Sequence, residues 1–364
     1  MPDCNSENER IKRKYFEYLK EAHQKSPSTV DNIRKSMTRF EVAMKHKSFK
    51  TFSKDQAIAF KRLFSEQKNR QTGEMLSKST LLGTLRNLKE FFKWLAYQPS
   101  YKSKIKIMDI DYFNMSEKDT RIAQSRKYKD FPTIGQVKKA IFSMPVTTDI
   151  QKRDRALIAF VLLSGMRDSA IASLKLKHID IYNMLIKQDP SEVKTKFSKR
   201  IDTYFFNVGK DIEQIVIEWV NYLLETRFFG MNDPLFPRTK MILDKNNCFI
   251  ADGIEPVHWQ TANQIRKIFK EAFAGAKLPY FNPHSLRNTL VNHGEKVCKN
   301  PEDFKAWSQN LGHENVLTTF NSYGTISPYR QGEVIRGLPD KPFSREELER
   351  TEKDLTLDLK RGTL

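Results

Sequence analysis

The chain has 364 residues, and because single hydrophobic cores rarely grow beyond roughly 250 to 300 residues, we expect two domains. Its 63 Lys and Arg exceed its 44 Asp and Glu, and the formal net charge of +19 at pH 7 favours a polyanionic partner such as nucleic acid. The three cysteines have no paired spacing and no long apolar run occurs, which argues against a disulfide framework, a cysteine zinc site and a membrane-spanning segment.

The basic surplus is uneven along the chain. Residues 1–130 hold 29 Lys and Arg against 16 Asp and Glu, whereas residues 131–364 hold 34 against 28. The N-terminal third is therefore expected to contribute most to the attraction of a polyanion.

The first part of the chain has helical periodicity. Residues 1–27 are polar and are expected to form an N-terminal arm or a helix with a thin apolar face. From Val30 to Met44, apolar residues recur at intervals of three and four, which is typical of an amphipathic helix. Similar patterns follow Ser53 and Ser79, so residues 28–98 predict a small helical domain, and the lysine-rich residues 99–130 predict a linker.

The second part predicts a larger domain over residues 131–338. Residues 156–163 are almost continuously apolar and predict a buried helix, with Arg167 just beyond its end. Two β-prone runs predict a small antiparallel sheet, so the fold class is mainly α with minor strand content. The β-prone runs are residues 179–187 and 201–208, and the further helices are expected at 212–224, 261–273, 283–296, 301–309 and 316–323. Residues 339–364 form a charged tail whose leucines favour one more helix.

Two histidines, an arginine and a tyrosine lie within three short motifs near the end of this domain. The motifs are Pro-His-Ser-Leu-Arg at 283–287, Leu-Gly-His at 311–313 and Asn-Ser-Tyr-Gly at 321–324. Metal-free cleavage of a phosphodiester needs a nucleophile, cations for the phosphate oxygens, a base and an acid. Tyr323 is the candidate nucleophile, and Arg167 and Arg287 offer the planar charged group that matches phosphate.

The spacing of these residues supports a shared site. His284 and Arg287 are three residues apart, so on a helix beginning near Pro283 they would share one face. His313 follows a glycine that permits a close turn and would lie near the N-terminus of the next helix, where a phosphate is also favoured.

The set resembles the tyrosine recombinases of the phage integrase family. Arg167, His284, Arg287, His313 and Tyr323 stand in the order of that family. The resemblance implies that residues 28–98 are a helical core-binding DNA domain and that residues 131–338 are an α+β catalytic domain of a site-specific integrase or recombinase.

The resemblance also implies roles. Tyr323 would attack the scissile phosphate and form a 3′-phosphotyrosyl link, Arg167 and Arg287 would neutralise the phosphate, and the histidines would relay a proton and bind a phosphate oxygen. The family's general acid is a lysine in a β-hairpin, which Lys194 matches better than Lys196. Lys196, Lys199 and Arg200 are expected to contact the DNA backbone. No metal-ligand spacing or nucleotide-binding motif occurs, so no cofactor is expected.

The chain departs from the family pattern at two positions. The family often has an acidic residue three positions after the first arginine, where this chain has Ala170, so support for Arg167 must come from another residue such as Asp168. The spacing from His313 to Tyr323 is one residue longer than the commonest family spacing. Tyr329 lies further along and next to a proline, so Tyr323 remains the expected nucleophile.

Family resemblance further implies a homotetramer on double-stranded DNA, with the tail over residues 339–364 packing on a neighbouring subunit and with accessory DNA-bending proteins as possible partners. Without a signal peptide or a membrane segment, a cytoplasmic, nucleoid-associated protein is expected, acting in integration or excision of a mobile element. Two alternatives remain at this stage: a catalytically silent DNA-binding regulator descended from an integrase, and an activity like that of type IB topoisomerases.

Overall fold

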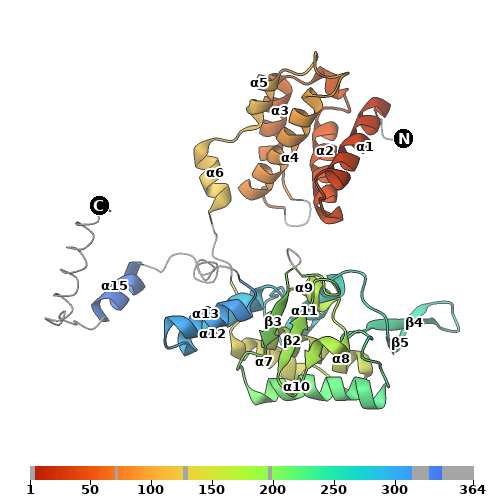
Figure 1. Cartoon of the computed structure of the whole chain (residues 1–364), viewed down its shortest axis with the longest axis vertical. Helices are drawn as coiled ribbons and strands as arrows, with labels where there is room; N and C mark the ends of the chain where they lie inside the picture. The colour runs from red at the N-terminus through yellow and green to blue at the C-terminus, as the bar shows by residue number, and fades with distance from the viewer. Residues whose placement is uncertain (1–4, 70–72, 126–129, 196–198, 314–327, 338–364) are drawn as a thin grey trace, which may run out of the picture. The chain divides into compact units, whose positions relative to one another are not determined.

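The computed structural model of the chain divides into two compact units, Met1–Arg126 and Lys127–Leu364, each with its own apolar core (Figure 1). We refer to them as the first and the second unit. Within the described residues, no helix has the length and apolar character that crossing a membrane requires. The residues whose structure is described are 5–69, 73–125, 130–195, 199–313 and 328–337.

The first unit is built from helices whose apolar faces meet in one core. Ser26, Ser77 and Ser116 each accept a backbone N–H at the start of a helix, which satisfies a donor that the helix itself cannot pair. The helices are α1 (Ser6–Glu21), α2 (Pro27–Ala43), η1 (Phe49–Thr51), α3 (Lys54–Ser65), α4 (Lys78–Ala96), α5 (Ile107–Ile110), η2 (Asp111–Phe113) and α6 (Glu117–Gln124).

Phenylalanines fill the centre of this core. Phe52 stacks on Phe92 with 3.9 Å between the ring centroids and on Phe113 with 5.4 Å. Phe40 meets Phe60 and Phe92 edge to face at 5.2 Å and 5.3 Å. Such contacts add to the free energy of area burial, so this small unit has a dense core of its own.

Two segments at the ends of the first unit are more structured than the sequence indicates. Residues 1–27 include α1, whose Tyr15 is buried in the core and whose Lys12 pairs with Glu41 of α2 at 2.6 Å. The predicted linker 99–130 contains three short helices, and Ile110 and Phe113 within it are buried in the same core. Single apolar residues in a lysine-rich stretch have no helical period, so the pattern could not reveal them.

The second unit is mainly helical with two small antiparallel sheets, as the predicted fold class requires. The predicted helix over 316–323 and the predicted tail lie outside the described residues. The helices are α7 (Ile134–Ser143), α8 (Asp149–Ser164), α9 (Asp168–Ile171), η3 (Leu176–His178), α10 (Lys210–Asn221), η5 (Tyr222–Thr226), α11 (Asn263–Gly275), α12 (Ser285–Val297), α13 (Pro301–Asn310) and α15 (Pro328–Gly337), and the strands are β1 (Ile179–Asp180), β2 (Leu185–Gln188), β3 (Ile201–Tyr204), β4 (Arg238–Leu243) and β5 (Phe249–Glu255).

Helix α8 forms the centre of the second unit. A capping box between Thr148 and Gln151 begins it, and its last nine residues are buried on every side, as the apolar run predicts. It ends at Gly165, which has a φ of 58°. A Cβ there would lie 2.8 Å from the side chains of Leu290 and Leu311, so only glycine fits between this helix end and its neighbours.

The first sheet has the order β1-β2-β3 and is antiparallel throughout. Leu185 pairs with Tyr204 and Gln188 with Ile201, so the segment between β2 and β3 leaves and returns at the same end of the sheet. This segment carries Lys194. The sheet therefore presents the lysine loop as the β-prone runs predict, although both runs form shorter strands than expected.

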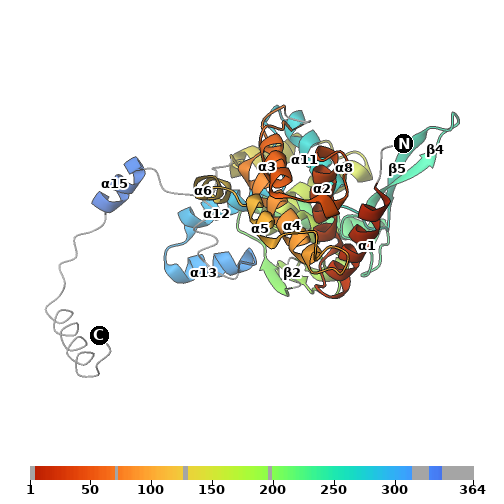
Figure 2. The same cartoon turned by 90° about the horizontal axis from the view of Figure 1, so that it is seen from above.

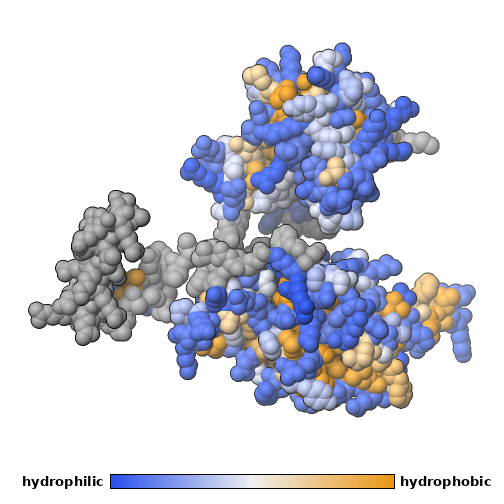
Figure 3. All heavy atoms as spheres, viewed as in Figure 1, coloured by the Kyte–Doolittle hydropathy of each residue, from blue (hydrophilic) through white to orange (hydrophobic). Residues whose placement is uncertain are grey.

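The second sheet, the β4–β5 hairpin, was not among the predicted elements. It extends beyond the helices of the second unit in both views (Figures 1 and 2). Figure 3 shows apolar residues gathered on this hairpin. Among its side chains, Leu243 is 56% exposed and Phe249 is 73% exposed. At its base, the fully buried Arg153 donates to the carbonyl oxygen of Pro237 at 3.0 Å and to Thr239 Oγ1 at 3.1 Å. Its strands lack strict alternation, which is why the pattern missed them.

Candidate active site

Arg167 owes its place to the end of α8. Ser164 Oγ accepts the N–H of Met166 at 3.3 Å, and Gly165 turns the chain in the left-handed conformation, so that Arg167 becomes the residue preceding α9. Its side chain is half-buried, and burial lowers its pKa from the ordinary value. The predicted buried helix thus delivers a charged side chain at the edge of the core.

Arg287 lies in the first turn of α12 and is only 5% exposed. Its guanidinium donates to the carbonyl oxygens of Gly165 at 2.5 Å and Leu311 at 2.6 Å, and to His313 Nε2 at 2.8 Å. Burial, with the charge of Arg167, lowers the pKa of Arg287 to about 9, so it stays charged at pH 7. These contacts with described residues use three of the five N–H groups of an arginine, which leaves donors for a ligand.

His313 follows Gly312, whose φ of 70° turns the chain back after α13. Because Arg287 can only donate, Nε2 of His313 accepts, and the proton of the neutral ring is on Nδ1. Burial and the charges of Arg287, Arg167 and His284 lower the pKa of His313 to about 4. At pH 7 the ring is therefore neutral and donates through Nδ1.

His284 differs from its sequence expectation in one respect. Helix α12 begins at Ser285, two residues later than expected, so His284 is its N-cap residue, although its backbone angles are still helical. It is exposed, whereas Arg287 is buried. Its charge still contributes to the lowered pKa of His313, which places it near the other three residues.

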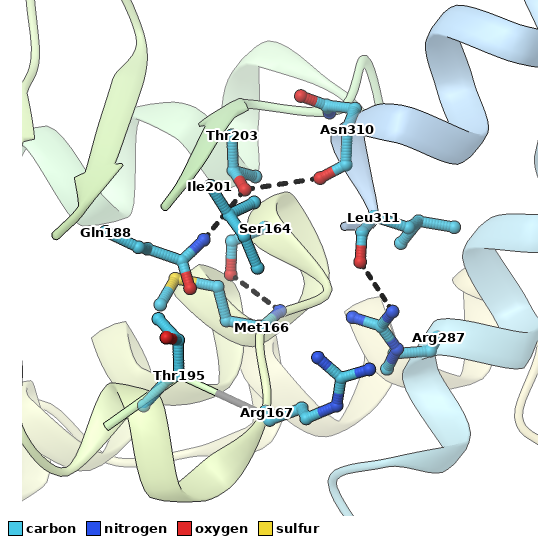
Figure 4. A pocket seen from close by; sticks show the side chains of 11 residues that line it. Ser164, Met166, Arg167, Gln188, Thr195, Ile201, Thr203, Arg287, Asn310 and Leu311 are labelled. Carbon is cyan, nitrogen blue, oxygen red and sulfur yellow. Dashed lines mark hydrogen bonds between the residues drawn. The ribbon is translucent and has the colours of Figure 1, made fainter. Parts of the chain in front are cut away.

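A cavity joins the two arginines (Figure 4). Arg167 and Arg287 both line it, together with polar side chains from the first sheet and from the end of α13. The polar lining residues of the sheet and of α13 are Gln188, Thr195, Thr203 and Asn310. Sequence analysis missed these four, because an isolated amide or hydroxyl in a strand, loop or helix end carries no motif.

The lysine loop is tied to the segment that follows Arg167. The backbone N–H of Lys194 donates to Ser173 Oγ at 2.9 Å, and the side chain of Lys194 is exposed. Its neighbour Thr195 lines the cavity, and Thr195 Oγ1 is buried without a hydrogen-bond partner among the described residues. The loop therefore brings Lys194 to the edge of the arginine cavity.

Glu192 fixes the same loop from the other side. Its carboxylate accepts from Lys177 at 2.8 Å, from Lys175 at 3.2 Å and from His178 Nε2 at 3.0 Å. His178 Nδ1 accepts the N–H of Lys175, so Nε2 carries the ring proton and donates. These hydrogen bonds, with that of Lys177 the largest, lower the pKa of Glu192 to about 2, and the carboxylate stays ionised at any working pH.

The remaining predicted residues are placed as follows. Lys196 and Tyr323 lie outside the described residues. Lys199 is half-buried and Arg200 is exposed, both just before β3. The structure thus brings together Arg167, His284, Arg287 and His313, with Lys194 on the adjoining loop.

Ala170 and Asp168 are the two residues at which the chain departs from, or was expected to make up for, the acidic residue of the family pattern. Ala170 is buried and lines the cavity, so an apolar contact fills that position. Asp168, directly after Arg167, accepts from Arg266 of α11 at 2.8 Å and 3.0 Å through one carboxylate oxygen. The side-chain contacts of Asp168 in the described residues are thus with Arg266 rather than Arg167, and the expected support of Arg167 by Asp168 stays a prediction.

This arrangement suits an anion with several oxygens. Two guanidinium groups line one cavity whose walls are partly removed from water, where hydrogen bonds to charge are stronger than in bulk solvent, and the neutral imidazole of His313 is hydrogen-bonded to one of them. Because Arg287 and His313 are already fixed by hydrogen bonds, they need little reorganisation when charge develops on the anion. A phosphate diester with developing negative charge fits these requirements.

Comparison with known proteins gives related findings. The profile of the phage integrase family matches residues 135–328. Among curated proteins, the chain is similar to the tyrosine recombinase XerC of Halalkalibacterium halodurans, with 23% identity over 323 residues, covering 88% of this chain and 93% of the relative. It is also similar to XerC of Lactobacillus delbrueckii subsp. bulgaricus, with 25% identity over 254 residues, covering 68% and 72%.

Solved structures show the same fold. A lambda integrase dimer bound to a COC′ core site matches with a TM-score of 0.59 and 11% identity, over 93% of this chain and 99% of that one. The XerH recombinase in its post-cleavage complex with a palindromic difH substrate matches with a TM-score of 0.56 and 18% identity, over 88% and 82%.

Proposed function

This chain belongs to the phage integrase family and is a tyrosine-type site-specific recombinase; we propose that the cavity between Arg167 and Arg287 is where its DNA strands are cleaved and rejoined. The observation that carries the proposal is that Arg167 and Arg287 line one cavity, with the neutral His313 hydrogen-bonded to Arg287. A scissile phosphate there would receive hydrogen bonds from both guanidinium groups and from Nδ1 of His313. Their positive charge opposes the charge that grows on the phosphate oxygens during attack.

In the proposed reaction, Tyr323 supplies the nucleophile. Its phenolic oxygen forms a bond to phosphorus while the bond from phosphorus to the 5′ oxygen breaks, which yields a 3′-phosphotyrosyl link and a 5′ hydroxyl. The phenolic proton passes to His284, and the leaving 5′ oxygen takes a proton from Lys194. Attack of a 5′ hydroxyl on the phosphotyrosine reverses each step and reseals the strand.

The assignment of the acid to Lys194 is supported by its place in the lysine loop. The N–H of Lys194 bonds to Ser173, and the next residue lines the cavity, which supports a place for this lysine near the proposed phosphate. Lys196 is the competing assignment. Lys199 and Arg200 flank the same loop and suit contacts to the DNA backbone.

DNA is the partner of the reaction, and the +19 charge supports phosphate contacts as the main source of affinity, which makes binding fall with salt. We further propose that four copies assemble on two DNA sites, with residues 339–364 packing on a neighbouring copy. Leu348 and Leu355 are seven residues apart and are the positions at which substitution should weaken that assembly.

A suicide DNA substrate tests the nucleophile. A nick next to the cleavage site lets the short 5′ fragment diffuse away, so cleavage leaves a covalent protein–DNA adduct that survives on a denaturing gel. The unmodified protein should form the adduct, Tyr323→Phe should not, and the matched control Tyr329→Phe should. An adduct with Tyr323→Phe would show that another residue attacks.

The same assay separates the other functions. A chain that binds the DNA site but never forms an adduct is a DNA-binding regulator, and one that relaxes a plasmid lacking the site acts as a topoisomerase. Mapping the covalent cleavage point on genomic DNA identifies the site and shows whether it borders a mobile element, which is the role that we propose.

A further inference from the structure

At Tyr204, the open edge of β3 is paired by an amide side chain. Asn310, the last residue of α13, accepts the backbone N–H of Tyr204 through Oδ1 at 2.7 Å and donates to the carbonyl oxygen of Tyr204 through Nδ2 at 2.8 Å. These are the two backbone groups that a neighbouring strand would pair. The Asn310 amide therefore takes the place of a peptide group in the next strand of the sheet.

Two further contacts hold β3 against the same segment. Thr203 Oγ1 donates to the carbonyl oxygen of Asn310 at 3.2 Å, in the group drawn in Figure 4. Gly312 lies so close to Ile201 that a Cβ on it would be 2.9 Å from that side chain. The strand thus fits against residues 310–312 through side chain, backbone and close packing together.

The other side of this segment holds the phosphate-binding groups. The carbonyl oxygen of Leu311 and Nε2 of His313 both accept from Arg287. Consecutive residues therefore bind β3 on one side and Arg287 on the other. Because β3 is the strand by which the lysine loop returns to the sheet, Asn310 links the two halves of the proposed reaction centre.

The two ends of the lysine loop are thus fixed to different parts of the site. The N–H of Lys194 bonds to Ser173, in the segment that follows Arg167, while β3 bonds to Asn310, next to the residues that hold Arg287. Each described end of the loop is therefore held by a hydrogen bond, and we infer that both contacts together set the position of Lys194 relative to the phosphate.

We propose that Asn310 is a positioning residue that sets the distance between the general-acid loop and the Arg287–His313 pair. This inference rests on the proposed function, because it needs an acid on the loop and a phosphate at Arg287. Although Asn310 lines the cavity, both polar atoms of its side-chain amide are engaged with Tyr204. It acts by keeping β3 in register with the segment that binds Arg287, so that the proton reaches the leaving 5′ oxygen.

A DNA substrate with sulfur in place of the bridging 5′ oxygen separates this role from a structural one. A thiolate leaves without help from an acid because its conjugate thiol has a much lower pKa than an alcohol. A protein whose acid is misplaced should therefore be slow on the oxygen substrate and normal on the sulfur substrate. A protein with a damaged phosphate site or fold should be slow on both.

Asn310→Asp is the principal variant, since it keeps the shape of the side chain but loses the Nδ2 donor and sets a carboxylate against the Tyr204 carbonyl oxygen. A misplacement of about 1 Å lowers rates by up to about 100-fold, so we expect cleavage of the oxygen substrate to fall about 10- to 100-fold and cleavage of the sulfur substrate to stay within about 3-fold of the unmodified protein. Asn310→Ser removes both hydrogen bonds to Tyr204 without adding charge, and we expect the same pattern of rates on the two substrates as for Asn310→Asp.

The matched control is Asn183→Asp, in the turn between β1 and β2 of the same sheet. Asn183 Nδ2 donates to Asp180 Oδ2 at 2.8 Å, so the substitution causes a comparable local loss away from the cavity. We expect this control to cleave both substrates normally. Thermal unfolding of the Asn310 and Asn183 variants, compared at equal salt, identifies any general loss of folding.

The outcomes separate the inference from the function on which it rests. If the Asn310 variants are equally slow on both substrates, or normal on both, Asn310 does not position the acid. Lys194→Ala is run in parallel: a defect that sulfur does not relieve would show that Lys194 is not the acid. Relief of the Asn310 variants alone would keep the inference and move the acid to another residue of the loop.

Discussion

The two arginines of the cavity are held in different ways. Arg287 is 5% exposed and makes three hydrogen bonds to the protein, two of them to backbone carbonyl oxygens. Arg167 is half-buried at the junction between α8 and α9, and its neighbour Asp168 pairs with Arg266 at the surface. One cation is therefore part of the core, and the other lies at the edge of the core beside an exposed ion pair. Arg287 is thus expected to contribute to both folding and catalysis, and Arg167 mainly to catalysis.

The largest effect should come from Arg287→Ala. Loss of a preorganised donor to developing charge costs about 100- to 1000-fold in rate, so adduct formation should fall by that factor. The substitution also leaves the buried carbonyl oxygens of Gly165 and Leu311 without their donor, which should lower the free energy of unfolding by about 2–4 kcal/mol. Adduct trapping and denaturant unfolding measure the two losses.

Arg167→Ala should lower the rate of adduct formation without a comparable loss in the free energy of unfolding. It removes a cation from the same cavity, so adduct formation should again fall by about 100- to 1000-fold. Because this side chain is only half-buried, the free energy of unfolding should change by less than about 1 kcal/mol. A loss of stability equal to that of Arg287→Ala would contradict the contrast between the two arginines.

The third prediction concerns His313, which is half-buried and hydrogen-bonded to the buried Arg287. Its pKa of about 4 lies below the ordinary 6.5, so protons bind the unfolded chain more readily. The stabilisation from neutral His313 is therefore complete above pH 6.5 and is lost as the pH falls from 6.5 toward 4. Allowing for its partial exposure, we expect about 1–2 kcal/mol, well below the value for full burial.

Unfolding across pH 4 to 7.5 tests this, because His313→Gln should flatten the dependence of stability on pH in that window. The control is His293→Gln, in α12 of the same unit. Equal slopes for the His313 variant and the unmodified protein would mean that the ring does not titrate as its surroundings imply.

The smallest effect should come from the exposed ion pair of Asp168, the residue that follows Arg167. Asp168→Asn weakens the pair with Arg266, whose side chain is 54% exposed, and exposed pairs contribute only about 0–1 kcal/mol. We expect little change in unfolding and a few-fold slower adduct formation. Arg266→Gln should give the same result, and a double variant no worse than either single one would show that both act through one contact.

The sequence was informative where local pattern and final environment agree. The continuous apolar run of α8 predicted a helix buried on every side, and the periodic residues from Val30 to Met44 predicted α2. It failed where burial depends on single residues, such as Phe113, or where apolar residues such as Phe249 remain exposed on a hairpin.

Within the site, charge and motif were predictable and hydrogen-bond geometry was not. The order of Arg167, His284, Arg287 and His313 indicated one centre. That Arg287 would be buried, and that its bond would fix the proton of His313 on Nδ1, depends on residues brought together only by the fold. The role of Asn310 was not predictable either, because it depends on contacts with Tyr204 at the edge of β3 that only folding creates.

Gly165 has a consequence for how this chain can change over evolutionary time. The residue combines a positive φ with a site where a single added carbon would meet two leucines, so a random library at this codon, selected for recombination, should return glycine alone. Its carbonyl oxygen also binds Arg287, so a shift of this backbone moves the arginine as well. Gly165, which has no side chain to take part in the chemistry, is therefore among the positions that tolerate the least variation.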